Sequence, residues 1–444
     1  MNIVILGNGI SGITAARHIR KLSDHDITVV SSETEYFFSR TAIMYIYMGH
    51  MRLEDTQPYE NWFWEKNNIR LKKAHVDKLE VSTRSLICND GSRINYDKLI
   101  LAVGSKTNKY GWPGQDLDGA EGLYSLQDLE YMEAYSEGLE RAVIVGGGLI
   151  GIEMAEMFLT RNIPVTMLVR ESSYWNNVLT PEESAMVNRQ ARSHGVDLRL
   201  STELERIVDN GSGKVDHVIT KDGERIDCGY VGITAGVSPN VEFLKNTELK
   251  IDQGILVNDY LETNIEGIYA TGDCAEIIEP RKGRKPIEAI WYAGRIMGEV
   301  VAYNVVGQPV KYDPGVWFNS AKFFDIEYQV YGQVPPEIED PLDSIHWEDE
   351  EGMRSVRLVF DKNDLTIQGF NLMGIRFRHE VCEKWIEDKA SLETVIENLK
   401  MAYFDPEFYN TDYDGIARKY SERFNKDINP RKRNLNQILS FLNS

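Results

Sequence analysis

Two glycine-rich turns, far apart in the chain, constrain its fold more than any other feature of the sequence. Both have the spacing GxGxxG, with Gly7, Gly9 and Gly12 in the first copy and Gly146, Gly148 and Gly151 in the second. The first glycine permits a tight turn, the second lets the backbone approach a pyrophosphate, and the third allows a helix to pack closely on a strand. Two such turns predict two bound dinucleotides, between which electrons can move.

The sequence around each turn alternates between apolar, strand-like runs and helical patterns. Residues 3–6 precede a helical stretch at 11–22 and a second apolar run at 27–30, and the same order returns between 142 and 169. This βαβ order is typical of a parallel, doubly wound sheet, whose phosphate ligands lie at helix N-termini. We therefore expect an α/β fold with two Rossmann-like dinucleotide-binding domains and a further C-terminal α/β domain.

Composition and charge exclude several classes of protein. A chain of 444 residues is long enough for two or three domains, and its net charge of −20 argues against nucleic acid as a ligand. No apolar run reaches the roughly 18 residues of a membrane span, and the N-terminus leads directly into the first expected strand, so we expect a cytoplasmic protein. The cysteines are scattered without a CxxC pair, which predicts neither a disulfide framework nor a metal site: Cys88, Cys228, Cys274 and Cys382.

Four stretches together resemble the FAD-dependent pyridine nucleotide-disulfide oxidoreductases, in particular the branch of ferredoxin and rubredoxin reductases. They are GNGISG at 7–12, KLILAVGS at 98–105, VIVGGGLIGIE at 143–153 and GIYATGDCAE at 267–276. The resemblance implies FAD on the first turn and NADH or NADPH on the second. It also implies hydride transfer to FAD and electron transfer to a small carrier such as ferredoxin or rubredoxin.

Breaks in the composition of the chain near 110–124, 236–240 and 312–317 indicate the expected domain boundaries. The FAD-binding domain consists of residues 1–112 and 244–312, and the NAD(P)H-binding domain, residues 113–243, is inserted between them. A C-terminal α/β domain covers 313–400, and a helical tail covers 401–444. In this tail Leu435, Ile438, Leu439 and Leu442 have helical spacing. The tail can cap a core, join the subunits of a homodimer or receive a partner.

Several residues are expected to contact FAD. Glu33, after the second apolar run, can accept hydrogen bonds from ribose hydroxyls. Asp273 in GIYATGD is expected to reach the ribityl or pyrophosphate groups, although Gly-Asp is also a common turn. Residues 286–304 resemble the family helix whose N-terminus points at the flavin, and Trp291 and Tyr292 in this stretch serve either the flavin or the core. The resemblance adds further backbone positions to the expected cofactor-binding set: Ala102, Gly104, Gly236 and Gly272.

The stretch YFFSRTAIMYIYMGHM at 36–51 contains no cysteine, which excludes a thiol relay there. It resembles the Y-x-R-P-P-L run of ferredoxin and rubredoxin reductases, with Arg40 matching the arginine and Thr41 and Ala42 replacing the prolines. Arg40 is therefore expected to act at the catalytic centre. Trp317, followed by Phe318, occupies the place where such relatives carry aromatic residues over the flavin.

The second turn offers candidates for nucleotide recognition. Glu153 is expected to hold the nicotinamide carboxamide close to the flavin, or else only to compensate the helix N-terminus. Arg170 suits the 2′-phosphate of NADPH, whereas the adjacent Glu171 suits the free ribose hydroxyls of NADH. The pair leaves both nucleotides open, with Arg170 tipping the balance slightly towards NADPH.

Without a redox thiol, electrons are expected to leave the flavin directly. A small redox carrier is the primary expectation, and the alternatives are an NAD(P)H oxidase or quinone reductase, or a slow-turnover flavoprotein redox sensor. The basic run RKGRK at 281–285 is either a docking rim for an acidic carrier or an ordinary solvated loop.

Overall fold

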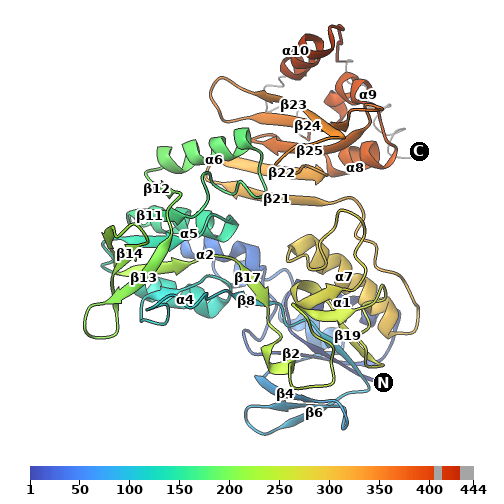
Figure 1. Cartoon of the computed structure of the whole chain (residues 1–444). Coiled ribbons are helices and arrows are strands. Elements are labelled where there is room, and N and C mark those ends of the chain that lie inside the picture. Colours follow the sequence, from blue (N-terminus) through green and yellow to red (C-terminus); the bar gives the residue numbers. More distant parts are fainter. Residues whose placement is uncertain (405–412, 431–444) are drawn as a thin grey trace. The chain divides into compact units, whose positions relative to one another are not determined.

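The computed structural model describes residues 1–404 and 413–430 (Figure 1). The four apolar positions of the expected tail helix, from Leu435 to Leu442, lie outside this range. The chain divides into two compact units. The first contains Met1–Gly146, Met157–Pro164 and Leu204–Pro314, and the second contains Gly147–Glu156, Val165–Glu203 and the described part of Gly315–Ser444. Among the described residues, no helix is both long and apolar enough to cross a membrane.

The first unit is built on a parallel five-stranded sheet of order β19-β7-β1-β2-β3. Its strands are β1 (Asn2–Leu6), β2 (Asp26–Ser31), β3 (Ile69–Lys73), β7 (Lys98–Leu101) and β19 (Ile268–Ala270). Helices α1 (Ile10–Leu22) and α7 (Trp291–Val305) pack against each other beside this sheet. A Cβ atom at Gly298 would lie 2.4 Å from the carbonyl oxygen of Ser11, so only glycine lets α7 approach α1 this closely.

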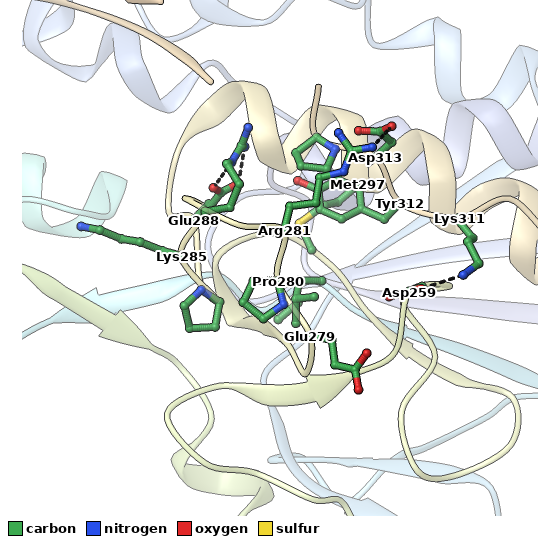
Figure 2. A pocket seen from close by; sticks show the side chains of 15 residues that line it. Asp259, Glu279, Pro280, Arg281, Lys285, Glu288, Met297, Lys311, Tyr312 and Asp313 are labelled. Atoms are coloured by element: carbon green, nitrogen blue, oxygen red, sulfur yellow. Dashed lines mark hydrogen bonds and ion pairs between the residues drawn. The ribbon is translucent and has the colours of Figure 1, made fainter. Parts of the chain in front are cut away.

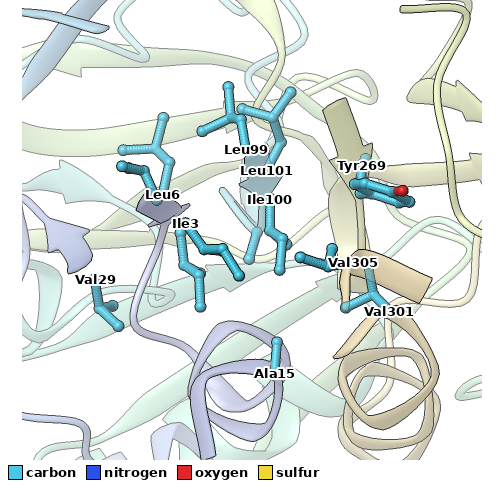
Figure 3. Packing of buried hydrophobic residues seen from close by; sticks show 14 of the residues in the cluster. Ile3, Leu6, Ala15, Val29, Leu99, Ile100, Leu101, Tyr269, Val301 and Val305 are labelled. Carbon is cyan, nitrogen blue, oxygen red and sulfur yellow. The ribbon is translucent and has the colours of Figure 1, made fainter. Parts of the chain in front are cut away.

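The core of the first unit lies between this sheet and these two helices (Figure 3). Ile3 of β1 and Ile100 of β7 have no exposed surface, and the helices contribute Ala15, Val301 and Val305. Val4 and Ile5, next to Ile3, are also 0% exposed, so both faces of β1 are covered, which explains its continuous apolar run in the sequence.

Smaller sheets complete the first unit. Three strands, β9 (Ala120–Glu121), β16 (Tyr230–Ile233) and β10 (Ala142–Val145), pair in parallel. Antiparallel groups are β4 (Val76–Glu80), β5 (Ser85–Cys88) and β6 (Arg93–Asn95); β13 (Leu204–Asp209), β14 (Val215–Thr220) and β15 (Arg225–Asp227); and β8 (Ser105–Thr107) with β17 (Val237–Pro239). Strands β18 (Ile255–Val257) and β20 (Ala275–Ile277) form a parallel pair. In addition to α1 and α7, the first unit contains the helices α2 (Ile43–Tyr47), α3 (Trp62–Lys66) and α4 (Leu126–Ser136).

The second unit combines the continuation of the second βαβ stretch with the C-terminal region. After α5 (Leu149–Thr160), strands β11 (Val165–Val169) and β12 (Asp197–Leu200) pair in parallel, with α6 (Pro181–Ser193) between them in the chain. The buried guanidinium of Arg357 donates a 2.8 Å hydrogen bond to Glu183 of α6 and so ties this helix to the C-terminal sheet.

That C-terminal sheet is antiparallel, with the order β21-β22-β25-β24-β23. Its strands are β21 (Phe318–Phe323), β22 (Ile326–Gly332), β23 (Leu342–Glu348), β24 (Ser355–Asp361) and β25 (Ile367–Met373). Helix α8 (His379–Glu387) packs on β22 and β25, and α9 (Leu392–Glu397) and α10 (Tyr413–Phe424) follow. The parallel sheets joined by helices confirm the predicted α/β fold class.

Candidate functional site

The first glycine turn has the geometry of a phosphate cradle. Gly7 adopts a φ of +113°, and a Cβ atom there would lie 2.0 Å from the carbonyl oxygen of Ala102. At Gly12 a Cβ would lie 2.1 Å from the carbonyl oxygen of Gly7, whereas at Gly9 it would meet nothing within 4 Å. No side chain caps the N-terminus of α1, which leaves backbone N–H groups for an anion. These residues fit the pyrophosphate of a dinucleotide.

Glu33, the expected ribose acceptor, is oriented by three hydrogen bonds at the end of β2. Its Oε1 accepts hydrogen bonds of 2.9 Å from both Arg40 Nη1 and the backbone N–H of Leu126, and its Oε2 accepts one of 2.5 Å from Arg40 Nη2. The Arg40 guanidinium also lies 4.7 Å from the ring centroid of Tyr124. A bidentate pair of this kind fixes direction as well as charge. The structure thus places Arg40 on Glu33, where it orients that carboxylate.

Asp273 is held by a residue that the sequence did not single out. The hydroxyl of Tyr124 donates to Asp273 Oδ2 at 3.2 Å and accepts the backbone N–H of Ser105 at 2.9 Å. Burial raises the pKa of Asp273 above its usual value, while hydrogen bonds from Tyr124 and Ser105 and the charge of Arg40 act in the opposite direction. The expected backbone position Gly104 is also part of this arrangement, because a Cβ there would lie 2.8 Å from the Tyr124 hydroxyl.

The sequence next to Tyr124 indicates the start of a helix, but it does not indicate a contact with the cofactor site. Ser125 and Asp128 form a capping box at the beginning of α4, and this pattern is readable from the sequence. Tyr124 contacts Ser105 and Asp273, which are distant from it in the sequence, so no periodicity or motif indicates these contacts.

The GIYATGD stretch lies beside the first glycine turn. The hydroxyls of Ser11 and Thr271 are 2.6 Å apart, and Gly272, with a φ of +76°, faces the side chain of Ser11. The first turn of α7 adjoins this point, since a Cβ at Gly294 would lie 3.9 Å from the Cα of Gly272. Trp291 begins that turn half-buried, and its contact with the flavin stays a prediction.

The second glycine turn repeats the steric pattern of the first. Gly146 adopts a φ of +134°, and a Cβ there would lie 2.4 Å from the carbonyl oxygen of Thr234. At Gly148 a Cβ would meet nothing within 4 Å, as at Gly9. The backbone N–H of Gly151 bonds to the carbonyl oxygen of Gly148 at 3.1 Å, which begins α5. This turn therefore also fits a pyrophosphate.

Two charged residues follow β11 and differ in their exposure. Arg170 is 72% exposed, and its Nη2 donates a 2.8 Å hydrogen bond to Glu171 Oε1. Glu171 is 31% exposed, and its other carboxylate oxygen lies 3.8 Å from the point where a Cβ of Gly147 would be. The carboxylate thus lies next to the glycine turn, while the guanidinium lies on the surface.

Glu153 lies in the first turns of α5, and the pKa of its carboxyl group is unusually high. Burial raises the pKa of Glu153 to about 7, and the charge of Glu156 adds to this effect. Its carboxyl group therefore changes charge near neutral pH. The remaining two expected site residues, Gly236 with a φ of +99° and Trp317 directly before β21, stay predictions.

The cysteines offer no route for thiol chemistry. All four, Cys88, Cys228, Cys274 and Cys382, are free and buried. Burial raises the pKa of Cys274 to about 11 and that of Cys228 to about 12, so these thiols remain protonated at neutral pH. Within residues 1–404 and 413–430, no group of histidine, cysteine and acidic side chains could hold a metal ion.

The RKGRK loop borders a cavity of about 340 Å³ in the first unit (Figure 2). Arg284 lies in a 2.5 Å ion pair with Glu288 in which the two side chains are only 10% and 8% exposed. Arg281 is paired with Asp313 at 2.5 Å, and Lys311, which also lines the cavity, is paired with Asp259 at 2.9 Å. Two of the four cations of this loop are thus paired with acids, and its role as a docking rim stays a prediction.

Comparison with known proteins agrees with this geometry. The family model described as pyridine nucleotide-disulphide oxidoreductase matches residues 1–297. The chain belongs to this family. This oxidoreductase is 32% identical over 340 residues to the NADH oxidase of Methanocaldococcus jannaschii, a match that covers 74% of the chain and 75% of that protein. It is 28% identical over 311 residues to the NADH-rubredoxin oxidoreductase of Clostridium acetobutylicum, covering 70% and 76%.

Among solved structures, the fold of this oxidoreductase is similar to that of an NAD-dependent persulfide reductase from A. fulgidus. The TM-score is 0.83 at 24% identity, and the match covers 96% of this chain and 84% of the other. The predicted membership in the family and its ferredoxin reductase-like branch is confirmed. The chain is an FAD-dependent NAD(P)H oxidoreductase with two dinucleotide-binding domains.

Proposed function

We propose that this oxidoreductase takes electrons from NADH and delivers them singly to a small redox-protein carrier of the ferredoxin or rubredoxin type. The observation that carries the proposal is the burial of all four cysteines, which leaves no thiol between the cofactor and the acceptor. When bound, FAD supplies a two-electron acceptor that can release electrons one at a time. The likeness to an NADH-rubredoxin oxidoreductase supports this choice of acceptor.

Each part of the FAD site has a separate task in this proposal. The Gly7–Gly12 turn and the N-terminus of α1 bind the pyrophosphate, and Glu33, oriented by Arg40, accepts the ribose hydroxyls. Asp273, held by Tyr124, binds a hydroxyl or phosphate group of the same cofactor. These groups position the cofactor and need no proton transfer of their own.

The second turn binds NADH in this proposal. Glu153 contacts the nicotinamide carboxamide, and Glu171 accepts the two hydroxyls of the adenosine ribose. The carboxylate of Glu171 beside the turn would repel a 2′-phosphate, and Arg170 is already engaged by that carboxylate. The placement of this pair favours NADH, in contrast to the slight preference for NADPH that Arg170 suggests in the sequence.

Two further properties belong to the proposal. A cytoplasmic location is supported by four free cysteines, since such thiols persist in reducing compartments. If the protein forms oligomers, we expect a homodimer.

A second candidate function, an NADH oxidase, is supported by the 32% identity to the protein of that name. One experiment separates the two. The holoenzyme is mixed with NADH, first without oxygen in the presence of a rubredoxin or ferredoxin, then in air without a carrier. Carrier reduction much faster than oxygen consumption supports the proposed reductase, and the reverse order supports the oxidase.

A further inference from the structure

A lysine from the C-terminal sheet reaches the helix that carries Glu153. Glu156 lies three residues after Glu153 on α5, so the two residues share one face of the helix, with their Cβ atoms about 5–6 Å apart. Lys322 of β21 donates a 2.7 Å hydrogen bond from Nζ to Glu156 Oε1. The Lys322 side chain is 36% exposed and that of Glu156 is 16% exposed, so water screens this pair only partly.

Few charged groups act on Glu153 within the second unit. Glu156 faces it from its own helix and opposes its ionisation. Tyr174, from the segment after β11, is fully buried, and its hydroxyl donates a 2.6 Å hydrogen bond to the carbonyl oxygen of Gly148. Burial raises the pKa of Tyr174 so far that it stays neutral. Burial is the main obstacle to the ionisation of Glu153, and the charge of Glu156, with whatever compensates it, adjusts how readily Glu153 becomes a carboxylate.

We propose that Lys322 is a positioning residue for hydride transfer, which neutralises Glu156 and so allows Glu153 to carry a negative charge next to the nicotinamide at neutral pH. The inference rests on the proposed contact of Glu153 with the carboxamide. As hydride leaves NADH, positive charge develops on the nicotinamide ring, and a nearby carboxylate stabilises it. In this proposal Lys322 acts on Glu153 through Glu156.

The test is the pH profile of flavin reduction by NADH, measured anaerobically in a single turnover of the holoenzyme. The rate is expected to rise with pH as Glu153 ionises. In Lys322→Met an uncompensated Glu156 opposes that ionisation, so the midpoint moves up by about half to one pH unit. In Glu156→Gln the opposing charge is gone, so the midpoint moves down. The double variant follows Glu156→Gln, because removal of the Glu156 charge also removes the route by which Lys322 acts on Glu153.

Matched variants separate this mechanism from a structural role. Lys362→Met removes another paired lysine of the second unit, whose partner is Asp340, and leaves the midpoint unchanged. Lys322→Arg keeps the charge and restores the original midpoint. Glu156→Gln keeps the inference testable even where Lys322→Met folds poorly. Unchanged midpoints in both single variants, or shifts of the same sign, would overturn the role of Lys322.

Glu153→Gln distinguishes a failure of this inference from a failure of the proposed function. A pH dependence that persists in Glu153→Gln would remove Glu153 from the reaction and the inference with it. A profile that becomes flat in Glu153→Gln, together with an unshifted Lys322→Met, would overturn the role of Lys322 alone.

Discussion

The hydroxyl of Tyr124 donates a hydrogen bond to Asp273 Oδ2 over 3.2 Å, although 149 residues separate the two in the chain. The same hydroxyl accepts the backbone N–H of Ser105, and the ring of Tyr124 lies under the guanidinium of Arg40. One side chain therefore organises both the aspartate of GIYATGD and the arginine that orients Glu33. A residue without a motif thus holds two residues of the candidate FAD site in place.

Replacing Tyr124 with phenylalanine is expected to weaken FAD binding. The change removes one hydrogen bond to Asp273 and leaves the N–H of Ser105 without its acceptor, a loss of about 1–2 kcal/mol, or roughly 5- to 30-fold in the dissociation constant. Titration of the apoprotein with FAD, followed by flavin fluorescence, measures this constant. Tyr110→Phe is the matched control, because Tyr110 is 61% exposed. Equal affinities for the Tyr124→Phe and Tyr110→Phe proteins would contradict the role of Tyr124.

Alanine substitutions in the first glycine turn are expected to separate folding from binding. Gly7→Ala forces a Cβ to within 2.0 Å of a backbone oxygen at a positive φ and should lower the melting temperature of the apoprotein by several degrees. Gly9→Ala adds its Cβ to open space, so the apoprotein should melt normally but bind little FAD. Thermal melts and the flavin content of the purified variants provide the measurements. Full FAD content in Gly9→Ala would show that the pyrophosphate lies elsewhere.

The raised pKa of Glu153 makes the apoprotein less stable as pH increases. The pKa is about 7 in the folded protein, against an ordinary value of 4.5, so between these values the folded state binds more protons than the unfolded state. Stability therefore falls as pH rises through this window and levels off above it. Glu153→Gln removes the effect, so the melting temperature of the variant relative to the original protein should increase from pH 5 to pH 8. A difference that stays constant between these two pH values would mean that Glu153 titrates normally.

Glu171→Ala is expected to change the choice of nucleotide. Loss of the carboxylate beside the second turn removes the acceptor for the ribose hydroxyls, and it also removes the negative charge that would repel a 2′-phosphate. The value of kcat/KM should fall about tenfold for NADH, which corresponds to one lost charged hydrogen bond, and should rise for NADPH. Arg170→Ala serves as the comparison and should leave the NADH value nearly unchanged. If the original protein prefers NADPH and Arg170→Ala lowers its activity with NADPH, the assignment of NADH as the nucleotide is wrong.

The two dinucleotide turns were predictable because their constraints act between near neighbours in the chain. At Gly12 the conflicting atom belongs to Gly7, and the apolar runs of β1 and β10 are needed wherever a parallel strand is covered on both faces. The charge of the RKGRK loop is harder to assess from the sequence, which counts all four cations as exposed. Arg284 pairs with Glu288, four residues further along the chain, but the pairing of Arg281 with Asp313 depends on how the chain folds.

The sequence by itself determined the family, the α/β class and the positions of both glycine turns, because steric limits on a tight turn depend on local residue identity. Only the tertiary structure decided which side chains support the site. Tyr124 meets Asp273, Arg40 turns to Glu33, and Lys322 reaches Glu156 across 166 residues of chain. Such contacts depend on how separate elements pack, and a hydrogen bond between distant residues leaves no periodic trace in either segment.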